Sequence, residues 1–224
     1  MTSCSACTVS SVEPAAARRP LLAMQSGHVE LDEEFTGLAD EHGLMTIAGF
    51  GDIFFARGIA RLETLEMSSL SVEEAPGHEV IVTLFEVEAT PGSIQAFIQR
   101  EHEFRFVAVE PHHLDGSPTG RKAVMCARWN DADYKRRRCP PEEWQRRYGK
   151  HGVDRIWRDD VLPCRVYLRH CVLAASKLGE PAHSNFLDAS VLGDRKTTVR
   201  QHLARDPAIL EELPPPELIG RYSG

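Results

Sequence analysis

The spacing of apolar residues changes from a helical to an extended period close to residue 100. Between residues 94 and 98 the apolar side chains fall at i, i+3 and i+4, which predicts a short helix with one apolar stripe. From Phe104 the period becomes two, which predicts a strand over 104–109. Glu101 takes the next position of the helical stripe. We therefore expect its carboxylate to face inward where the helix meets the strand.

Further strands are predicted on both sides of this helix. Residues 79–87 are apolar on both faces, which is typical of a strand in the middle of a sheet. The apolar run 53–55 and the mixed run 67–72 predict two shorter strands before it, and residues 123–129 predict one more after the helix.

The C-terminal half shows helical patterns instead. Four helices are predicted: one from Pro141, one from Pro163 to Gly179, one around 182–187, and one capped by Thr197 or Thr198 that ends before Pro207. The basic run 135–138 is flanked by acidic residues, which favours a solvated helix face over a nucleic-acid patch.

Strands early in the chain and helices late indicate an α+β fold. We expect a small mixed sheet that is curled or closed into a barrel, with an added C-terminal helical region. The chain then divides into a disordered or atypical N-terminal segment at 1–43, one domain at 44–206, and a surface tail at 207–224 that contains three consecutive prolines.

Composition and charge exclude several classes of protein. The 224 residues carry a net charge of −7, which argues against nucleic acid as a partner. No apolar run approaches the roughly 20 residues that cross a bilayer, so we expect no membrane partner. Six cysteines are too sparse for a disulfide scaffold, and we predict no metal site. The simplest compartment is the cytoplasm; the Ser- and Ala-rich N-terminus with Arg18 and Arg19 leaves an organelle as the alternative.

Glu101 is the main candidate for a catalytic residue. A carboxylate that faces inward is costly to keep ionised unless it is partnered, and burial raises such a pKa toward the range of a general base. The structural alternative is a Glu paired with Arg100 or Arg105. Its spacing leaves both interpretations open.

The order of parts around Glu101 resembles the γ-glutamylcyclotransferase superfamily, including its ChaC-type branch. A strong strand at 80–87 is followed by a helix, by the Arg100–Glu101 pair at its end, and by an aromatic-led strand. Residues 183–187 are similar to the family's late S-x-N-x-x-L helix start. The resemblance covers about residues 50–205, and it implies a γ-glutamylcyclotransferase-like domain at 44–206.

The resemblance implies an activity and a set of site residues. A γ-glutamyl peptide or amine is converted to 5-oxoproline and a released amine, with Glu101 as general acid and base, or Glu103 if the helix ends later. No cofactor is needed, and the partner is the small γ-glutamyl substrate. The residues implied in substrate binding are Gly49, Gly51, Ser69, Arg100 and Phe104.

One part of the family pattern is altered. The superfamily has a Y-G-S-L-type loop after its first strand, whose backbone N–H groups hold the substrate. The only candidate is 49–52, which has Asp52 where Ser belongs and precedes Glu101 by too few residues. We therefore interpret 49–52 as a chance similarity to that loop. Two alternatives follow: a catalytically impaired member that serves as a binding module, or an enzyme of the same fold with a larger substrate. The sequence does not indicate an oligomeric state.

Overall fold

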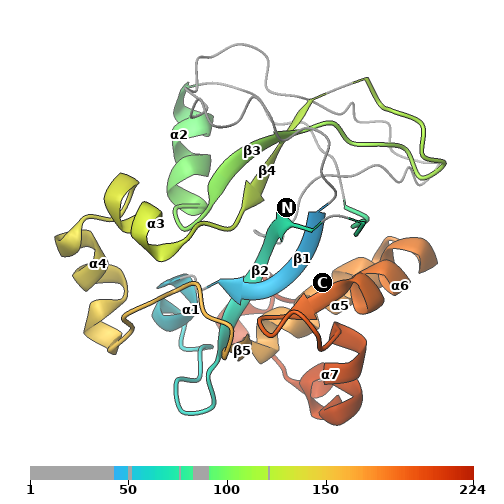
Figure 1. Ribbon diagram of the computed structural model, residues 1–224. Helices are drawn as coiled ribbons and strands as arrows, with labels where there is room; N and C mark the ends of the chain where they lie inside the picture. The colour runs from blue at the N-terminus through green and yellow to red at the C-terminus, as the bar shows by residue number, and fades with distance from the viewer. Residues whose placement is uncertain (1–42, 50–51, 76, 83–90, 121) are drawn as a thin grey trace.

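The computed structural model describes residues 43–49, 52–75, 77–82, 91–120 and 122–224 (Figure 1). Within these residues the chain is a mixed α and β structure. Its helices, 3-10 turns (η) and strands are, in chain order, β1 (Gly43–Gly49), α1 (Asp52–Ala56), β2 (Glu66–Glu74), α2 (Pro91–Arg100), β3 (Arg105–Val109), β4 (Ala123–Ala127), α3 (Asp131–Arg137), α4 (Pro141–Arg147), η2 (Gly149–His151), β5 (Leu162–Pro163), α5 (Arg165–Lys177), α6 (Glu180–Ala189), β6 (Ser190–Leu192), α7 (Val199–Arg205), η3 (Pro207–Glu211) and η4 (Pro216–Leu218).

The described strands form one mixed sheet in the order β3-β4-β2-β1-β6, and β5 pairs with β2 outside this path. β1 is antiparallel to β2 and parallel to β6, whereas β3 and β4 form an antiparallel pair. The two parts meet at the bridge between Val72 and Ala127. Because β3 and β6 are edges, the described sheet is open, and the barrel alternative is not formed by these strands.

Two hydrophobic clusters flank this sheet. Figure 1 shows α5, α6 and α7 gathered on one side of the molecule and α2, α3 and α4 on the other. The first cluster is mainly aliphatic and unites α5, α6 and α7 with Phe54 and Leu70. The second is rich in aromatic residues and includes Phe104, Tyr134 and Tyr148. The helical groups therefore cover separate parts of the sheet, and each buries its own apolar stripe.

Most of the predicted elements are confirmed. The predicted strands at 67–72, 104–109 and 123–129 correspond to β2, β3 and β4, and the helix ahead of Glu101 is α2. The helices predicted from Pro141 and around 182–187 are α4 and α6. α7 begins after Thr198, whose side chain accepts from the Gln201 N–H in a capping box.

The strand predicted at 79–87 is wrong over 79–82, which have no regular structure, and 83–87 lie outside the described residues. The backbone of this segment forms hydrogen bonds with a side chain of α6 instead. Asn185 accepts from the Ile81 N–H at 2.7 Å and donates to the Glu79 carbonyl at 3.3 Å. The central strand is β2, which pairs with β1, β4 and β5. The sequence pattern does not predict a central strand here, because the serines lower the hydrophobicity of a strand that is buried on both faces.

The strand predicted at 53–55 is also wrong, because these residues belong to helix α1. Phe54 is buried in the first cluster and its ring lies 5.1 Å from the ring of Tyr167. Phe55 points to the second cluster and stacks on His151. A helical turn can send neighbouring side chains to two clusters, and a short apolar run does not distinguish this from a strand.

The ends of the chain differ in what can be described. Residues 1–42, which include most of the predicted N-terminal segment, lie outside the described residues. The predicted surface tail contributes Ile209 and Tyr222 to the first cluster, both almost fully buried. Among the described helices, none combines the length and the apolar character that a membrane span requires.

Candidate functional site

Two buried carboxylates lie where α2 passes into β3. Glu101 is 2 % exposed and Glu103 is 5 % exposed. The Glu101 N–H donates to the Phe97 carbonyl at 2.9 Å, which continues the helical pattern of α2 by one residue. The Phe104 N–H then donates to the Glu101 carbonyl at 3.0 Å and closes the turn. The inward position predicted for Glu101 is therefore confirmed.

Glu101 is paired with its neighbour in the chain. Arg100 Nε donates to Glu101 Oε1 at 2.8 Å, and the Arg100 side chain is 45 % exposed. The guanidinium of Arg100 also lies 5.2 Å from the ring centre of Phe97. A half-exposed cation thus balances a carboxylate that is itself removed from water.

Glu103 belongs to a chain of polar side chains. The Tyr148 hydroxyl donates to Glu103 Oε1 at 2.9 Å and lies 3.3 Å from the Tyr134 hydroxyl. The Tyr134 hydroxyl in turn lies 2.8 Å from His102 Nδ1. Burial, followed by the negative charge of Glu103, raises the pKa of Tyr134 above its usual range. Tyr134 therefore stays a neutral hydroxyl, and two tyrosines connect the His102 imidazole to the Glu103 carboxylate.

His102 brings this network to a pocket between α2 and α4. The pocket has a volume of about 700 Å³, and its lining includes His102 but neither Glu101 nor Glu103. Its character is polar and cationic, because the lining consists of Gln95, Ile98, Gln99, His102, Arg138, Glu143, Arg146 and Arg147.

The residues implied in substrate binding fall into separate groups. Gly49 at the end of β1 pairs with Ser69 of β2, so the structure brings these two together. Arg100 contacts Glu101, as described above. The ring of Phe104 packs edge-to-face against Trp157, 5.8 Å between centres, within the second cluster. Gly51 lies outside the described residues.

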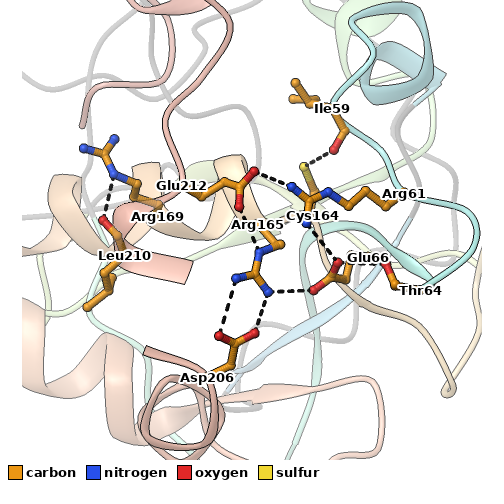
Figure 2. Close-up of polar contacts among 10 residues, drawn as sticks. All are labelled: Ile59, Arg61, Thr64, Glu66, Cys164, Arg165, Arg169, Asp206, Leu210 and Glu212. Atoms are coloured by element: carbon orange, nitrogen blue, oxygen red, sulfur yellow. Dashed lines mark hydrogen bonds and ion pairs between the residues drawn. The ribbon is translucent and has the colours of Figure 1, made fainter. Parts of the chain in front are cut away.

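A second polar cluster lies at the start of α5 (Figure 2). Arg165 donates to Glu66 Oε1 at 2.9 Å, to Asp206 Oδ2 at 2.5 Å and to Glu212 Oε2 at 3.1 Å. Arg61 also pairs with Glu212 and approaches Glu66. The hydrogen bonds that Arg165 donates to Asp206 and then to Glu66 hold the pKa of Arg165 above its usual range. This cluster joins β2 and α5 to the residues that flank η3.

The described residues provide no group of three or more His, Cys, Asp or Glu side chains placed to share a metal ion. The C-x-x-C sequence of Cys4 and Cys7 lies outside them.

Comparison with protein-family models, curated proteins and solved structures finds no match to this chain.

Sequence patterns do not single out His102, Tyr134 or the pocket arginines. Two signals were present: His102 directly follows Glu101, and Trp144 and Tyr148 stand at the i, i+4 spacing of a buried helix face. Neither signal says that α4 lies beside α2. The pattern of the basic run 135–138 predicts a solvated helix face, but its last residue, Arg138, lines the pocket.

Proposed function

We propose that the chain catalyses a γ-glutamyl cyclotransferase reaction in which Glu101 is the general base and acid. The observation that carries this proposal is the burial of Glu101, 2 % exposed, at the helix–strand junction where the family resemblance requires a catalytic carboxylate. A base removed from water acts with fixed geometry and without competition from solvent.

The proposed reaction is intramolecular. Glu101 takes a proton from the α-ammonium of the γ-glutamyl group, and the freed amine attacks the side-chain carbonyl carbon. A new C–N bond closes the 5-oxoproline ring, the original amide C–N bond breaks, and the departing amine receives the proton that Glu101 took. The ring nitrogen loses its remaining extra proton, which the released amine takes up to become an ammonium ion. Because both reacting groups belong to one molecule, the protein has to fold the substrate and position one base. Arg100 supplies the cation that balances the ionised base.

The segment after β1 bears on substrate binding. β1 ends at Gly49 and α1 begins at Asp52. The superfamily that the sequence resembles has its substrate loop after the first strand, but Asp52 stands where that loop has Ser, so 49–52 departs from the family pattern. Gly49 is the register partner of Ser69, so two of the residues implied in substrate binding are neighbours.

The test is direct. The purified full chain is incubated with glutathione, γ-glutamyl amino acids and γ-glutamyl-lysine, and 5-oxoproline is measured by mass spectrometry. We expect product from at least one substrate, and Glu101→Gln should lower kcat by about 10²–10⁴-fold because it removes the proton acceptor. Circular dichroism and thermal unfolding establish that the variant is folded.

Glu103→Gln is the matched control, because it alters a second buried carboxylate two residues away. Activity that survives Glu101→Gln but is lost in Glu103→Gln would identify Glu103 as the base. Absence of product from every substrate would overturn the enzymatic proposal. Saturable binding of a γ-glutamyl compound in that case would favour the binding module, for which Asp52 in place of Ser is the motivating observation.

A further inference from the structure

Four side chains form a hydrogen-bonded chain from the pocket to a buried carboxylate. His102 is half-buried and lines the pocket. Tyr134 and Tyr148 are fully buried, and Glu103 is 5 % exposed. The contacts measure 2.8 Å from His102 Nδ1 to the Tyr134 hydroxyl, 3.3 Å between the two hydroxyls, and 2.9 Å from the Tyr148 hydroxyl to the carboxylate. The two middle groups are therefore out of reach of solvent.

The number of hydrogens fixes the direction of this chain. A hydroxyl carries one hydrogen and an ionised carboxylate carries none, so the hydrogen of Tyr148 is the one donated to Glu103. The contact between the tyrosines then requires the hydrogen of Tyr134, and the contact with His102 requires a hydrogen on Nδ1. His102, Glu103 and Tyr148 make other interactions as well, but these do not change how many hydrogens the two hydroxyls carry. With Glu103 ionised, all three contacts are hydrogen bonds only if Nδ1 carries a hydrogen.

The same chain is complete in the opposite direction when Glu103 is protonated. The carboxyl group then donates to Tyr148, Tyr148 donates to Tyr134, and Tyr134 donates to a bare Nδ1 of the imidazole. A shift of three protons, each along one hydrogen bond, converts this arrangement into the first. The O–H bond of Glu103 breaks, each tyrosine loses one proton and gains another, and an N–H bond forms at Nδ1. A neutral acid and a neutral imidazole become a carboxylate and an imidazolium, which then releases its Nε2 proton to solvent.

The tyrosines can pass protons because they remain hydroxyls. Burial, followed by the negative charge of Glu103, raises the pKa of Tyr134 above its usual range. The Cys139 thiol also bonds the Tyr134 hydroxyl, but burial raises the pKa of this thiol, and a neutral thiol is a weak hydrogen-bond partner. Tyr134 therefore serves the chain as a neutral donor and acceptor.

His102 is the member of the chain that can exchange protons near neutral pH, because imidazole changes its charge in that range. It does so among charged groups of both signs. Arg100 and Glu101 precede it and pair with each other. The charged residues that share the pocket lining with it are Arg138, Glu143, Arg146 and Arg147.

We propose that Tyr134 and Tyr148 form a proton relay through which the buried Glu103 exchanges its proton with the pocket at His102. The relay lets a carboxylate that is removed from water change its charge without opening of the fold. Glu103 is also the alternative base of the γ-glutamyl reaction, and in that case the relay carries the proton taken from the substrate. This use in catalysis rests on the proposed function, whereas the relay itself rests on the four groups and their contacts.

NMR of the full chain, labelled with ¹⁵N-histidine and ¹³C-glutamate, tests the relay. The carboxyl carbon reports whether Glu103 is ionised, and the ring nitrogens report whether His102 Nδ1 carries a hydrogen; Glu103→Gln and His102→Gln assign the signals. Between about pH 5 and pH 9, wherever Glu103 is ionised, we expect forms with a hydrogen on Nδ1 to outnumber the bare form by about tenfold, the equivalent of one hydrogen bond. An ionised Glu103 with a bare Nδ1, or a protonated Glu103 with a neutral imidazole that carries its hydrogen on Nδ1, would overturn the proposal.

Tyr134→Phe and Tyr222→Phe form a matched pair of variants. Both rings are buried, but the Tyr222 hydroxyl contacts Arg57 and is not a member of the chain. Tyr134→Phe should lower the excess of the Nδ1–H form by about tenfold, and Tyr222→Phe should leave it unchanged. Tyr148→Phe interrupts the next link and takes the place of Tyr134→Phe if circular dichroism shows that variant to be unfolded. An excess that survives the loss of the hydroxyl would overturn the relay.

Activity measurements separate the relay from the proposed reaction. The pH profile of 5-oxoproline formation should follow the His102 titration seen by NMR. Tyr134→Phe should displace this profile by about one pH unit, and Tyr222→Phe should not. An unchanged profile in Tyr134→Phe would overturn the use of the relay in catalysis. Absence of 5-oxoproline would overturn the proposed function, and the NMR result would still decide the relay.

Discussion

Two clusters of arginines and carboxylates in this molecule differ in which of the two groups is more numerous. In the cluster around Arg165, the carboxylates of Glu66, Asp206 and Glu212 outnumber the guanidinium groups of Arg165 and Arg61. In the α2–α4 pocket, three arginines outnumber one carboxylate. Both clusters contain short hydrogen-bonded ion pairs, so the presence of ion pairs does not tell them apart.

The two clusters also differ in which elements their ion pairs connect. Around Arg165, one guanidinium is shared by Glu66 of β2, by Asp206 between α7 and η3, and by Glu212 just after η3, which ties these parts of the chain to α5 (Figure 2). In the pocket, Arg146 and Arg147 share the carboxylate of Glu143, which belongs to the same helix. The first arrangement ties distant elements of the fold together, whereas the ion pairs of Glu143 lie within one helix.

The largest effect is expected from Arg165→Met. The substitution keeps much of the side-chain volume but removes the cation shared by three carboxylates, one of which, Glu66, is 8 % exposed. Removing one partner of a buried ion pair leaves uncompensated charge, so we expect a loss of about 3–5 kcal/mol in the free energy of unfolding. Urea denaturation followed by circular dichroism measures it.

The control for this prediction is Arg200→Met. Arg200 makes a bidentate pair with Asp188, but both side chains are more than half exposed. Water replaces the lost partner there, so stability should remain within the error of the measurement. Similar losses in the two variants would show that the Arg165 cluster has no special structural role.

An intermediate effect is expected from Tyr148→Phe, which changes one of the two tyrosines that connect His102 to Glu103. The variant removes the hydroxyl that donates to Glu103, a buried carboxylate, and should cost about 1–3 kcal/mol of unfolding free energy. Tyr222→Phe is the matched control. Its ring is equally buried, but its hydroxyl contacts Arg57, which is half-buried, so the loss should be smaller. A larger loss in Tyr222→Phe contradicts the prediction.

The sequence predicts those features of the fold that depend on residues close together in the chain. Local patterns were sufficient for α2 and its inward Glu101, because helical spacing and the change of period are properties of consecutive residues. They were sufficient for α7 as well, since the cap at Thr198 lies beside the helix that it begins. These are short-range features.

Contacts between distant residues were beyond such patterns. The segment at 79–82 is apolar enough for a strand, yet Asn185, more than 100 residues later, binds its backbone. The pocket likewise depends on α4 lying beside α2, which no local spacing encodes. Arg138 is in the basic run 135–138, but its guanidinium lies over the ring of Phe106 and it is less exposed than Arg136 and Arg137.

The smallest effect concerns the pH dependence of the pocket's own ion pairs. Hydrogen bonds from Arg146 and then Arg147 lower the pKa of Glu143 from its ordinary value of 4.5 to about 2. A carboxylate whose pKa is depressed on folding adds stability above its unfolded pKa, and this stability is lost as the pH falls through the folded pKa. Glu143→Gln should therefore destabilise the protein near pH 6 and have almost no effect near pH 2.

The side chain of Glu143 is 26 % exposed, so solvent screening keeps the difference at pH 6 below about 1 kcal/mol. Urea denaturation of both proteins at pH 6, 4 and 3 measures how the difference shrinks. In an Arg146→Gln background the pH dependence should be smaller, because one of the two cations responsible is gone. A difference that is constant with pH, or that grows on acidification, would mean that Glu143 is not held by its arginines. The pocket would then lose the fixed pair of guanidinium groups that sets it apart from the Arg165 cluster.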